Sequence, residues 1–288
     1  MILLTGATGL VGSALLPKLL SEKHQVRAMV RDPRRLGPER VRVQIALMDL
    51  ADPHGLRHSL RGVKTVIHLG AATRDEPRAR IEEVNALGTA RLLQAAERAG
   101  VERFLFFSAL NATRSQRTRY FRSKALAEEA VRASPLDTTV FAPSIVYGPD
   151  DPWVTLIRRM ALLPVLPISG SGEAPFQPIC ADDAASCVIA ALGSNGARHE
   201  LAGPETLSYE RIARLIANSA GRERPVVHVP LGLVRRGLLW WRALAGPHAF
   251  ATWEEAELLE VPMVSASGTE DVRELGVEPR AMPEVLAG

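Results

Sequence analysis

The chain opens on the stretch Ile2-Leu3-Leu4-Thr5-Gly6-Ala7-Thr8-Gly9-Leu10-Val11-Gly12, from which its architecture can be inferred. Residues 2–4 are apolar at both even and odd positions, which predicts a short strand buried on both faces. After the glycines, Val11, Leu15 and Leu19 recur at the spacing of one helix face. The opening stretch therefore predicts a strand, a glycine turn and a helix.

The three glycines of the turn stand where a dinucleotide-binding turn needs them. Gly6 permits the tight turn, Gly9 lets a pyrophosphate approach the backbone, and Gly12 lets the helix pack closely on the sheet. The N-terminus of the helix offers free N–H groups and the positive end of its dipole to phosphate. The alternative is a turn whose glycines serve packing alone. In this strand–turn–helix context we favour phosphate binding.

Strand and helix patterns alternate through the first half of the chain. Gly100 ends a helical pattern over residues 82–99, as a C-terminal glycine does. This alternation predicts an α/β fold with a doubly wound parallel sheet, the Rossmann fold, over residues 1–148. The other buried strands are expected at residues 26–30, 41–47, 65–69, 104–107 and 138–141.

The pattern changes after Tyr147-Gly148-Pro149, where proline and glycine become frequent. Residues 149–288 are expected to form mainly a small α+β substrate lobe over the carboxyl edge of the sheet, where doubly wound folds bind ligands. A segment near residues 176–192 is expected to return to the Rossmann sheet.

Composition excludes several classes of protein. The 288 residues are 47% hydrophobic and 23% charged, so a disordered or disulfide-scaffold chain is excluded. The net charge is only +3, without a dominant basic block, so we expect no nucleic-acid partner. Cys180 and Cys187 form no metal-binding pattern, and we expect no metal site. With no signal-peptide pattern at the N-terminus, we expect a cytoplasmic protein.

The end of the second predicted strand bears on the choice of cofactor. An acidic residue here binds the ribose 2′-hydroxyl of NAD, whereas arginine favours the 2′-phosphate of NADP. Arg31 comes first, before Asp32, so we predict NADP(H) over NAD(H). The alternative is a solvated basic loop in which Asp32 selects the nucleotide.

Two motifs carry a resemblance to a known family. The turn T-G-A-T-G-x-V-G over residues 5–12 and the run Tyr120-Phe121-Arg122-Ser123-Lys124 resemble the short-chain dehydrogenase/reductase superfamily, in its extended or atypical NAD(P)-dependent epimerase/dehydratase branch. Segments around Asn85-x-x-Gly88-Thr89 are similar as well. The resemblance implies cofactor contacts at Gly6, Thr8, Gly9, Leu10, Val11, Arg31, Asp49, Leu50, Leu69, Gly70, Ala71, Ser108, Tyr120, Lys124, Pro143 and Ile145.

One subgroup is especially similar. Phe176-Gln177-Pro178-Ile179, Asp182-Asp183-Ala184 and the tail Leu275-Gly276-Val277-Glu278-Pro279-Arg280 resemble relatives of the NAD(P)H-binding accessory subunit of respiratory complex I. That subgroup implies a second class of function, in which bound NADP(H) is a structural element or redox sensor and no reaction is catalysed.

The resemblance implies catalytic roles for Tyr120 and Lys124. Residues four apart lie on one face of a helix, and an ammonium there is expected to lower the pKa of the phenol, which is otherwise about 10. The pair would move a proton to or from a substrate hydroxyl during hydride transfer. The family usually carries Ser-Ser-Ser/Thr after the fifth strand, but this chain has Ser108-Ala109-Leu110-Asn111. Ser108, Asn111 and Thr113 are the candidates that would polarise the substrate; the alternative is that polarisation is lost while cofactor binding remains.

We favour an oxidoreductase or epimerase/dehydratase acting on a small molecule that the sequence does not identify. The alternative is the non-catalytic NADP(H)-binding protein. Family analogy also implies a homodimer through helices at 79–99 and 120–133.

Further residues have predicted roles. His68 is expected to be a hydrogen-bonded core residue, and Asp182-Asp183 to cap the helix that follows. The arginine-flanked Trp240-Trp241 is expected in the core of the small lobe. The alternative for the tryptophans is a surface that contacts a membrane or a protein complex.

Overall fold

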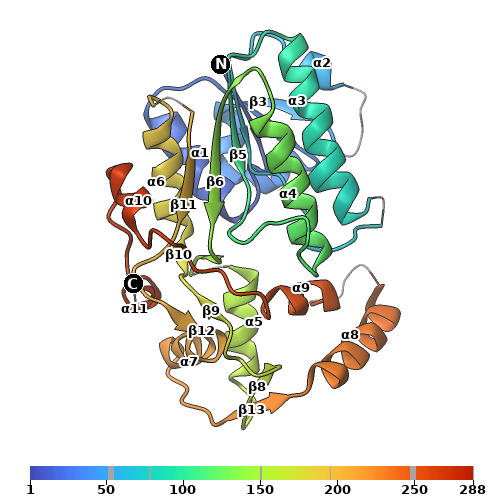
Figure 1. The fold of residues 1–288 in the computed structure, drawn as a ribbon, viewed down its shortest axis with the longest axis vertical. Helices are drawn as coiled ribbons and strands as arrows, with labels where there is room; N and C mark the ends of the chain where they lie inside the picture. Colours follow the sequence, from blue (N-terminus) through green and yellow to red (C-terminus); the bar gives the residue numbers. More distant parts are fainter. Residues whose placement is uncertain (51–54, 78, 150, 195, 247–250, 288) are drawn as a thin grey trace.

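A computed structural model describes residues 1–288 except 51–54, 78, 150, 195, 247–250 and 288, and except the side chain of residue 242. The described residues form a seven-stranded sheet in the order β11-β6-β5-β4-β1-β2-β3, and every neighbouring pair is parallel (Figure 1). The doubly wound α/β prediction is thus confirmed. The strands are β1 (Ile2–Thr5), β2 (Val26–Val30), β3 (Gln44–Leu47), β4 (Thr65–His68), β5 (Arg103–Phe107), β6 (Asp137–Pro143) and β11 (Arg198–Leu201).

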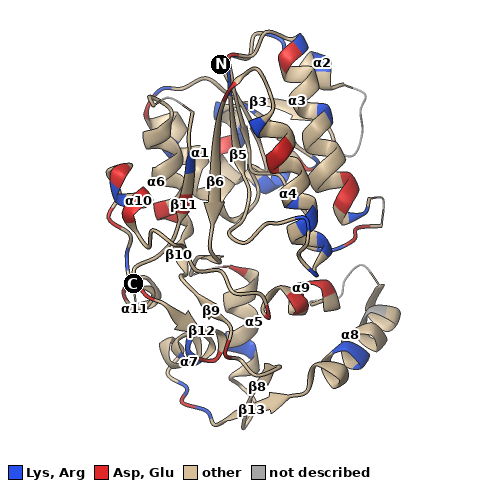
Figure 2. Ribbon diagram, in the orientation of Figure 1, with Lys and Arg blue, Asp and Glu red and all other residues tan. Residues whose placement is uncertain are grey.

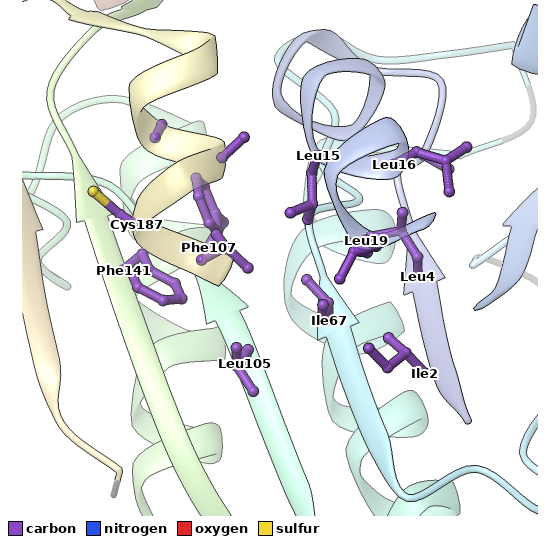
Figure 3. Packing of buried hydrophobic residues seen from close by; sticks show 14 of the residues in the cluster. Ile2, Leu4, Leu15, Leu16, Leu19, Ile67, Leu105, Phe107, Phe141 and Cys187 are labelled. Atoms are coloured by element: carbon purple, nitrogen blue, oxygen red, sulfur yellow. The ribbon is translucent and has the colours of Figure 1, made fainter. Parts of the chain in front are cut away.

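Helices cover both faces of the sheet. α1 (Leu10–Ser21) and α6 (Ala181–Ala191) pack on the face that Leu4 shares with Ile67. Figure 3 shows Leu15, Leu16 and Leu19 of α1 beside these strand residues. The other face, with Leu3 at its centre, packs against helices of the first half of the chain. These are α2 (Leu56–Ser59), α3 (Thr89–Arg98) and α4 (Arg119–Arg132).

The small lobe lies beyond the carboxyl ends of the strands, with its own buried cluster (Figure 1). Phe176, Ile168 and Ile212 are fully buried in that cluster. The lobe comprises α5 (Pro152–Met160), β8 (Leu166–Ser169), β9 (Pro175–Phe176), β12 (Leu207–Ser208), α7 (Tyr209–Ser219), β13 (Val226–Val229) and α11 (Met282–Ala287).

The second half of the chain also returns to the Rossmann domain. Within the segment 176–192, β10 (Ile179–Cys180) pairs with β7 (Val146–Tyr147), and α6 packs on α1. The strand that joins the sheet is β11, just after that segment, on the free side of β6. α10 (Glu270–Glu274) then packs beside β11, a return that the sequence did not indicate.

Two expectations for the first half need correction. Residues 41–47 are not one buried strand: the 3-10 helix η1 (Pro33–Arg42) extends to residue 42, and Val41 is 84% exposed. Strand β3 is the edge of the sheet and is mostly exposed, because no strand pairs with its outer side. The helix expected over 82–99 contains a π-helical turn, η2 (Glu83–Gly88), before α3, and Gly100 ends it with φ +71°.

The expectation that Trp240 and Trp241 lie in the core of the small lobe is wrong, because both are exposed. α8 (Leu231–Ala245) exposes 73% of Trp240 and 40% of Trp241. It projects beside the small lobe and meets α9 (Trp253–Leu258) (Figure 1). Of the helices described, none is both long and apolar enough to cross a membrane.

Candidate functional site

The glycine turn lies between β1 and α1, as predicted. Gly6 has φ +71°, and a Cβ there would lie 2.8 Å from the Gly70 nitrogen; a Cβ on Gly12 would lie 2.1 Å from the Gly6 oxygen. Packing alone thus requires these two glycines. Around a Cβ on Gly9, the sole neighbour among described atoms is the Gly6 oxygen at 3.2 Å. That contact is tight but far less severe than the one at Gly12, and Gly9 lies at the start of the helix, where a phosphate can approach the backbone.

His68 holds the ends of the first and fourth strands together. Its Nδ1 lies 2.6 Å from the Thr5 hydroxyl and its Nε2 lies 2.8 Å from the Thr89 hydroxyl. Because Thr89 donates its own proton to the Asn85 carbonyl, Nε2 is the donor and Nδ1 the acceptor. Burial, aided by the nearby positive charge of Lys124, lowers the pKa of His68 to about 3. His68 is a neutral, hydrogen-bonded core residue, as predicted.

Asn85 ties the turn after β4 to α4. Its side-chain oxygen accepts from the Ala72 N–H at 2.8 Å, and its amide donates to the Ala72 carbonyl and to Ser123 Oγ. The Ser123 hydroxyl in turn donates to the Tyr120 carbonyl. Asn85 therefore positions the α4 segment that carries the tyrosine and lysine.

Leu50 lies against the same turn. A Cβ on Gly70 would lie 2.5 Å from Leu50 Cδ1, so a larger residue there would require the end of the Leu50 side chain to shift. Leu50 also packs on Ala72 and Val84. The residues expected to contact the cofactor after β3 and after β4, Leu50 and Gly70, are thus brought together.

Arg31 follows β2 and is bound by acidic residues. Its guanidinium pairs with Glu76, and Nη1 lies 4.0 Å from Asp49 Oδ2. Those contacts raise the pKa of Arg31, the hydrogen bond to Glu76 most of all. Asp32 instead accepts a hydrogen bond from the Arg34 N–H at 3.0 Å and caps η1. Glu76 was missed at the sequence level, since 45 residues separate it from Arg31.

Tyr120 and Lys124 lie one turn apart on α4. Lys124 is 2% exposed; its ammonium donates to the Phe107 carbonyl at the end of β5 and lies 4.5 Å above the Phe106 ring. Burial lowers the pKa of Lys124 to about 7, an effect that the carboxylate of Glu128 opposes. Burial also raises the pKa of Tyr120 to about 12. The expected lowering of the phenol's pKa is therefore absent, because desolvation outweighs the lysine.

The hydroxyl group of Ser108 is hydrogen-bonded to Glu128. Ser108 is 3% exposed and donates its hydroxyl proton to the buried carboxylate of Glu128. Glu128 also accepts from Arg198 Nε at 2.9 Å, and Arg198 binds Glu200 at 2.8 Å. A hydroxyl has one proton, so Ser108 in this arrangement has none to donate to a substrate oxygen. The sequence did not indicate this network, whose members come from the end of β5, from α4 and from β11.

The loop after β6 is held by both halves of the chain. The Pro143 carbonyl accepts from the Leu110 N–H at 2.9 Å, and the Ile145 carbonyl accepts from the Ile179 N–H at 3.0 Å. Between them, the Ser144 hydroxyl donates to the Met263 carbonyl at 2.7 Å. Pro143 and Ile145 therefore lie at the junction of the Rossmann domain and the small lobe.

The capping role expected for Asp182-Asp183 is wrong in detail. Both lie in the first turn of α6, but Cys180 is the cap residue and its side chain makes no capping hydrogen bond. Asp183 is buried and binds Arg280 at 2.6 Å, while Asp182 binds Lys18 at 2.9 Å. The ion pair with Arg280 therefore holds the C-terminal segment against the start of α6. Across the described residues no group of His, Cys, Asp and Glu could hold a metal ion.

The predicted residues lie at the carboxyl ends of β1 to β6, apart from those on α1 and α4. The N-terminus of α1 and the end of β5, which Lys124 contacts, thus lie at one edge of the sheet, the edge at which doubly wound folds bind ligands. Thr8, Leu10, Val11, Leu69 and Ala71 lie in the two turns that flank Gly6 and Gly70.

Comparison with known proteins agrees with this site. A family model described as NAD(P)H-binding matches residues 6–159. NADH dehydrogenase (ubiquinone) 1 alpha subcomplex subunit 9, mitochondrial, of Arabidopsis thaliana is 28% identical over 260 residues, which are 85% of this chain and 62% of that protein. The chain thus spans less than two thirds of that relative's length. Sterol demethylase protein B of Methylococcus capsulatus is 30% identical over 81% of this chain and 78% of its own length.

A solved structure supports the fold. The UDP-glucose 4-epimerase of Thermus thermophilus, in complex with NAD, has a TM-score of 0.75 at 21% identity and covers 99% of this chain and 96% of its own. The family model covers more than half of the chain and includes the glycine turn, Tyr120 and Lys124. The chain therefore belongs to the NAD(P)H-binding family, with the extended short-chain dehydrogenase/reductase fold that its sequence resembles.

Proposed function

We propose that this protein is an NADP(H)-dependent oxidoreductase or epimerase/dehydratase, with Tyr120 as acid/base and Lys124 as its electrostatic partner. The observation that carries the proposal is the Tyr–Lys pair, one turn apart on α4, with a partly buried tyrosine and a buried lysine that reaches the end of β5. Bound nicotinamide would supply or accept the hydride. Tyr120 would exchange the proton with the substrate oxygen, and Lys124 would orient the cofactor ribose.

The pKa of Tyr120 favours the reductive direction. A phenol whose pKa is about 12 is protonated at neutral pH. It is then ready to donate to a carbonyl oxygen that gains negative charge as hydride arrives. We therefore propose a carbonyl compound as substrate.

A cofactor titration followed by a turnover assay tests this proposal. Ligand at ~100 times its Kd should stabilise the folded protein by about 2.7 kcal/mol, which gives a clear rise in Tm with NADPH. Carbonyl compounds from a test panel should then oxidise bound NADPH, and nucleotide sugars, whose hydroxyl groups make them hydride donors, should reduce bound NADP+. Tyr120→Phe should keep the Tm rise and lose turnover; a variant that retains turnover would exclude Tyr120 as the acid. We place the protein in the cytoplasm, which cell fractionation tests.

The choice of NADP(H) rests on Arg31. Its guanidinium lies at the end of β2 with its side chain 53% exposed, and Glu76 and Asp49 neutralise it. A 2′-phosphate would have to replace Glu76 as its partner. Arg31→Ala should therefore weaken the binding of NADPH about tenfold more than that of NADH, and Glu76→Gln should strengthen the binding of NADPH. Arg34→Ala, in the same loop, is the matched control; equal losses of both nucleotides in Arg31→Ala would defeat the preference.

A second function is favoured by the residues after β5. Ser108 donates to Glu128, and Leu110, where the family usually has a hydroxyl, is 3% exposed. With no hydroxyl proton directed at a substrate, the protein would bind NADP(H) as a structural element or redox sensor. Protein that gains Tm with NADPH but oxidises none of the panel would support this function over the first.

A further inference from the structure

Helix α8 has two adjacent apolar faces. At 100° per residue, Leu231, Val234, Leu238 and Trp241 share one face. Leu233, Gly237, Trp240 and Leu244 share a second face about 110° away, which we call the outer face. A helix that only packs against its own domain needs one apolar face, and no packing of the outer face is found among the described residues.

The exposures of the side chains agree with this division. On the outer face Leu233 is 56%, Trp240 73% and Leu244 79% exposed. The other face is half-buried and contacts α9, where the Arg235 guanidinium lies 5.6 Å above the Trp253 ring. Figure 1 shows α8 standing out from the body of the protein, at the lower right of the view, between β13 and α9. Exposed large side chains at helical spacing form a contiguous apolar stripe, which marks an interaction surface.

The charges along α8 are all of one sign. Its sequence contains three arginines, at 235, 236 and 242, and no acidic residue. Figure 2 correspondingly shows blue and no red on this helix. The neighbouring α9 is acidic, but Glu255 faces the Rossmann domain, where it accepts from Thr73 at 3.1 Å and lies 3.8 Å from Arg74. The side chain of residue 242 lies outside the described part of the chain.

We propose that the outer face of α8 docks on the surface of a lipid bilayer that contains anionic lipid. Tryptophan and leucine enter the boundary between headgroups and acyl chains, while Arg236, which flanks the outer face, meets lipid phosphates. Fifteen residues at 1.5 Å each give a helix of about 22 Å, shorter than the ~30 Å hydrocarbon core. The helix would therefore lie along the surface. This proposal stands apart from the reaction proposed above.

Vesicle co-sedimentation of the full chain tests the docking. The protein should sediment with vesicles of phosphatidylcholine and phosphatidylglycerol at low salt, and much less with phosphatidylcholine alone or at high salt. Trp240→Ala and Leu244→Glu should each lower the partition constant about tenfold. Val41→Glu, an equally exposed change at the end of η1, should leave it unchanged. Because the altered side chains are exposed, each variant should keep the wild-type Tm and far-UV circular dichroism.

Three results would overturn the proposal. The first is wild-type protein that stays in the supernatant with the anionic vesicles at low salt. The second is sedimentation that Trp240→Ala and Leu244→Glu leave unchanged. The third is a dimer in vesicle-free solution that these two variants convert to a monomer, because the outer face would then bind a second copy of the chain.

Discussion

Replacing Lys124 with methionine should change how the stability of the protein depends on pH. The folded pKa of Lys124 is about 7, against the ordinary value of 10.5 expected in the unfolded chain. Between these values the unfolded chain binds the proton and the folded protein does not. The contribution of Lys124 to the free energy of unfolding therefore falls as the pH falls from about 10.5 to about 7, and it is lowest below pH 7. Any rise in the free energy of unfolding over this range comes from other groups. From pH 7 to pH 9 this group alone should add about 2 kcal/mol.

Urea unfolding of the wild type and of Lys124→Met, at intervals from pH 6 to pH 9, measures this effect. The difference in unfolding free energy between the two proteins isolates Lys124, because other titrating groups are common to both. Relative to the variant, the wild type should gain about 2 kcal/mol between pH 7 and pH 9. Lys64→Met removes an exposed lysine and keeps Lys124, so it should show the wild-type pH dependence. A difference between wild type and Lys124→Met that is flat over this range would refute the burial of an ionisable Lys124.

Three further predictions separate structure from binding. Gly12→Ala should lower the free energy of unfolding by about 1–3 kcal/mol, because its Cβ would lie 2.1 Å from the Gly6 oxygen. Gly9→Ala should keep its Tm and lose the Tm rise with NADPH. A Gly9→Ala protein that still gains Tm with NADPH would contradict a phosphate site at this turn. Because the pKa of His68 is about 3 when folded, the protein should lose about 3 kcal/mol as the pH falls from 6.5 to 4, and His68→Asn should lack this loss in urea titrations. Arg198→Ala leaves the buried Glu128 without its cation and should cost about 1–3 kcal/mol, with Glu128→Gln in the same background restoring part of it; no rescue would show that the arginine acts by packing alone.

Much of the fold could be predicted because the signals are local. Apolar runs of four or five residues predict buried strands, and the glycines at 6, 9 and 12 each meet a local geometric need. The prediction failed at residues 41–47, where apolar Val41 lies exposed in the 3-10 helix η1, before the edge strand β3. It also failed at Trp240, because hydrophobicity indicates a preference for burial but not the neighbour that would provide it.

The site was predicted only in its parts. Tyr120 and Lys124 are one helical turn apart in any α-helix, so the sequence indicates that they share a face. Their pKa values depend on burial, which the sequence does not state: Lys124 donates to the Phe107 carbonyl and lies above the Phe106 ring, and Tyr120 is desolvated. The two groups therefore titrate in the directions that burial dictates.

The sequence by itself determined the strand–turn–helix start and the alternation that builds a parallel sheet. These follow from interactions between residues close together in the chain. Only the tertiary structure decided that Glu76 neutralises Arg31 across 45 residues, that Glu128 takes the proton of Ser108, and that α8 leaves an apolar face exposed. Each depends on which distant segments meet, and therefore on the packing of the whole chain, which no local pattern encodes.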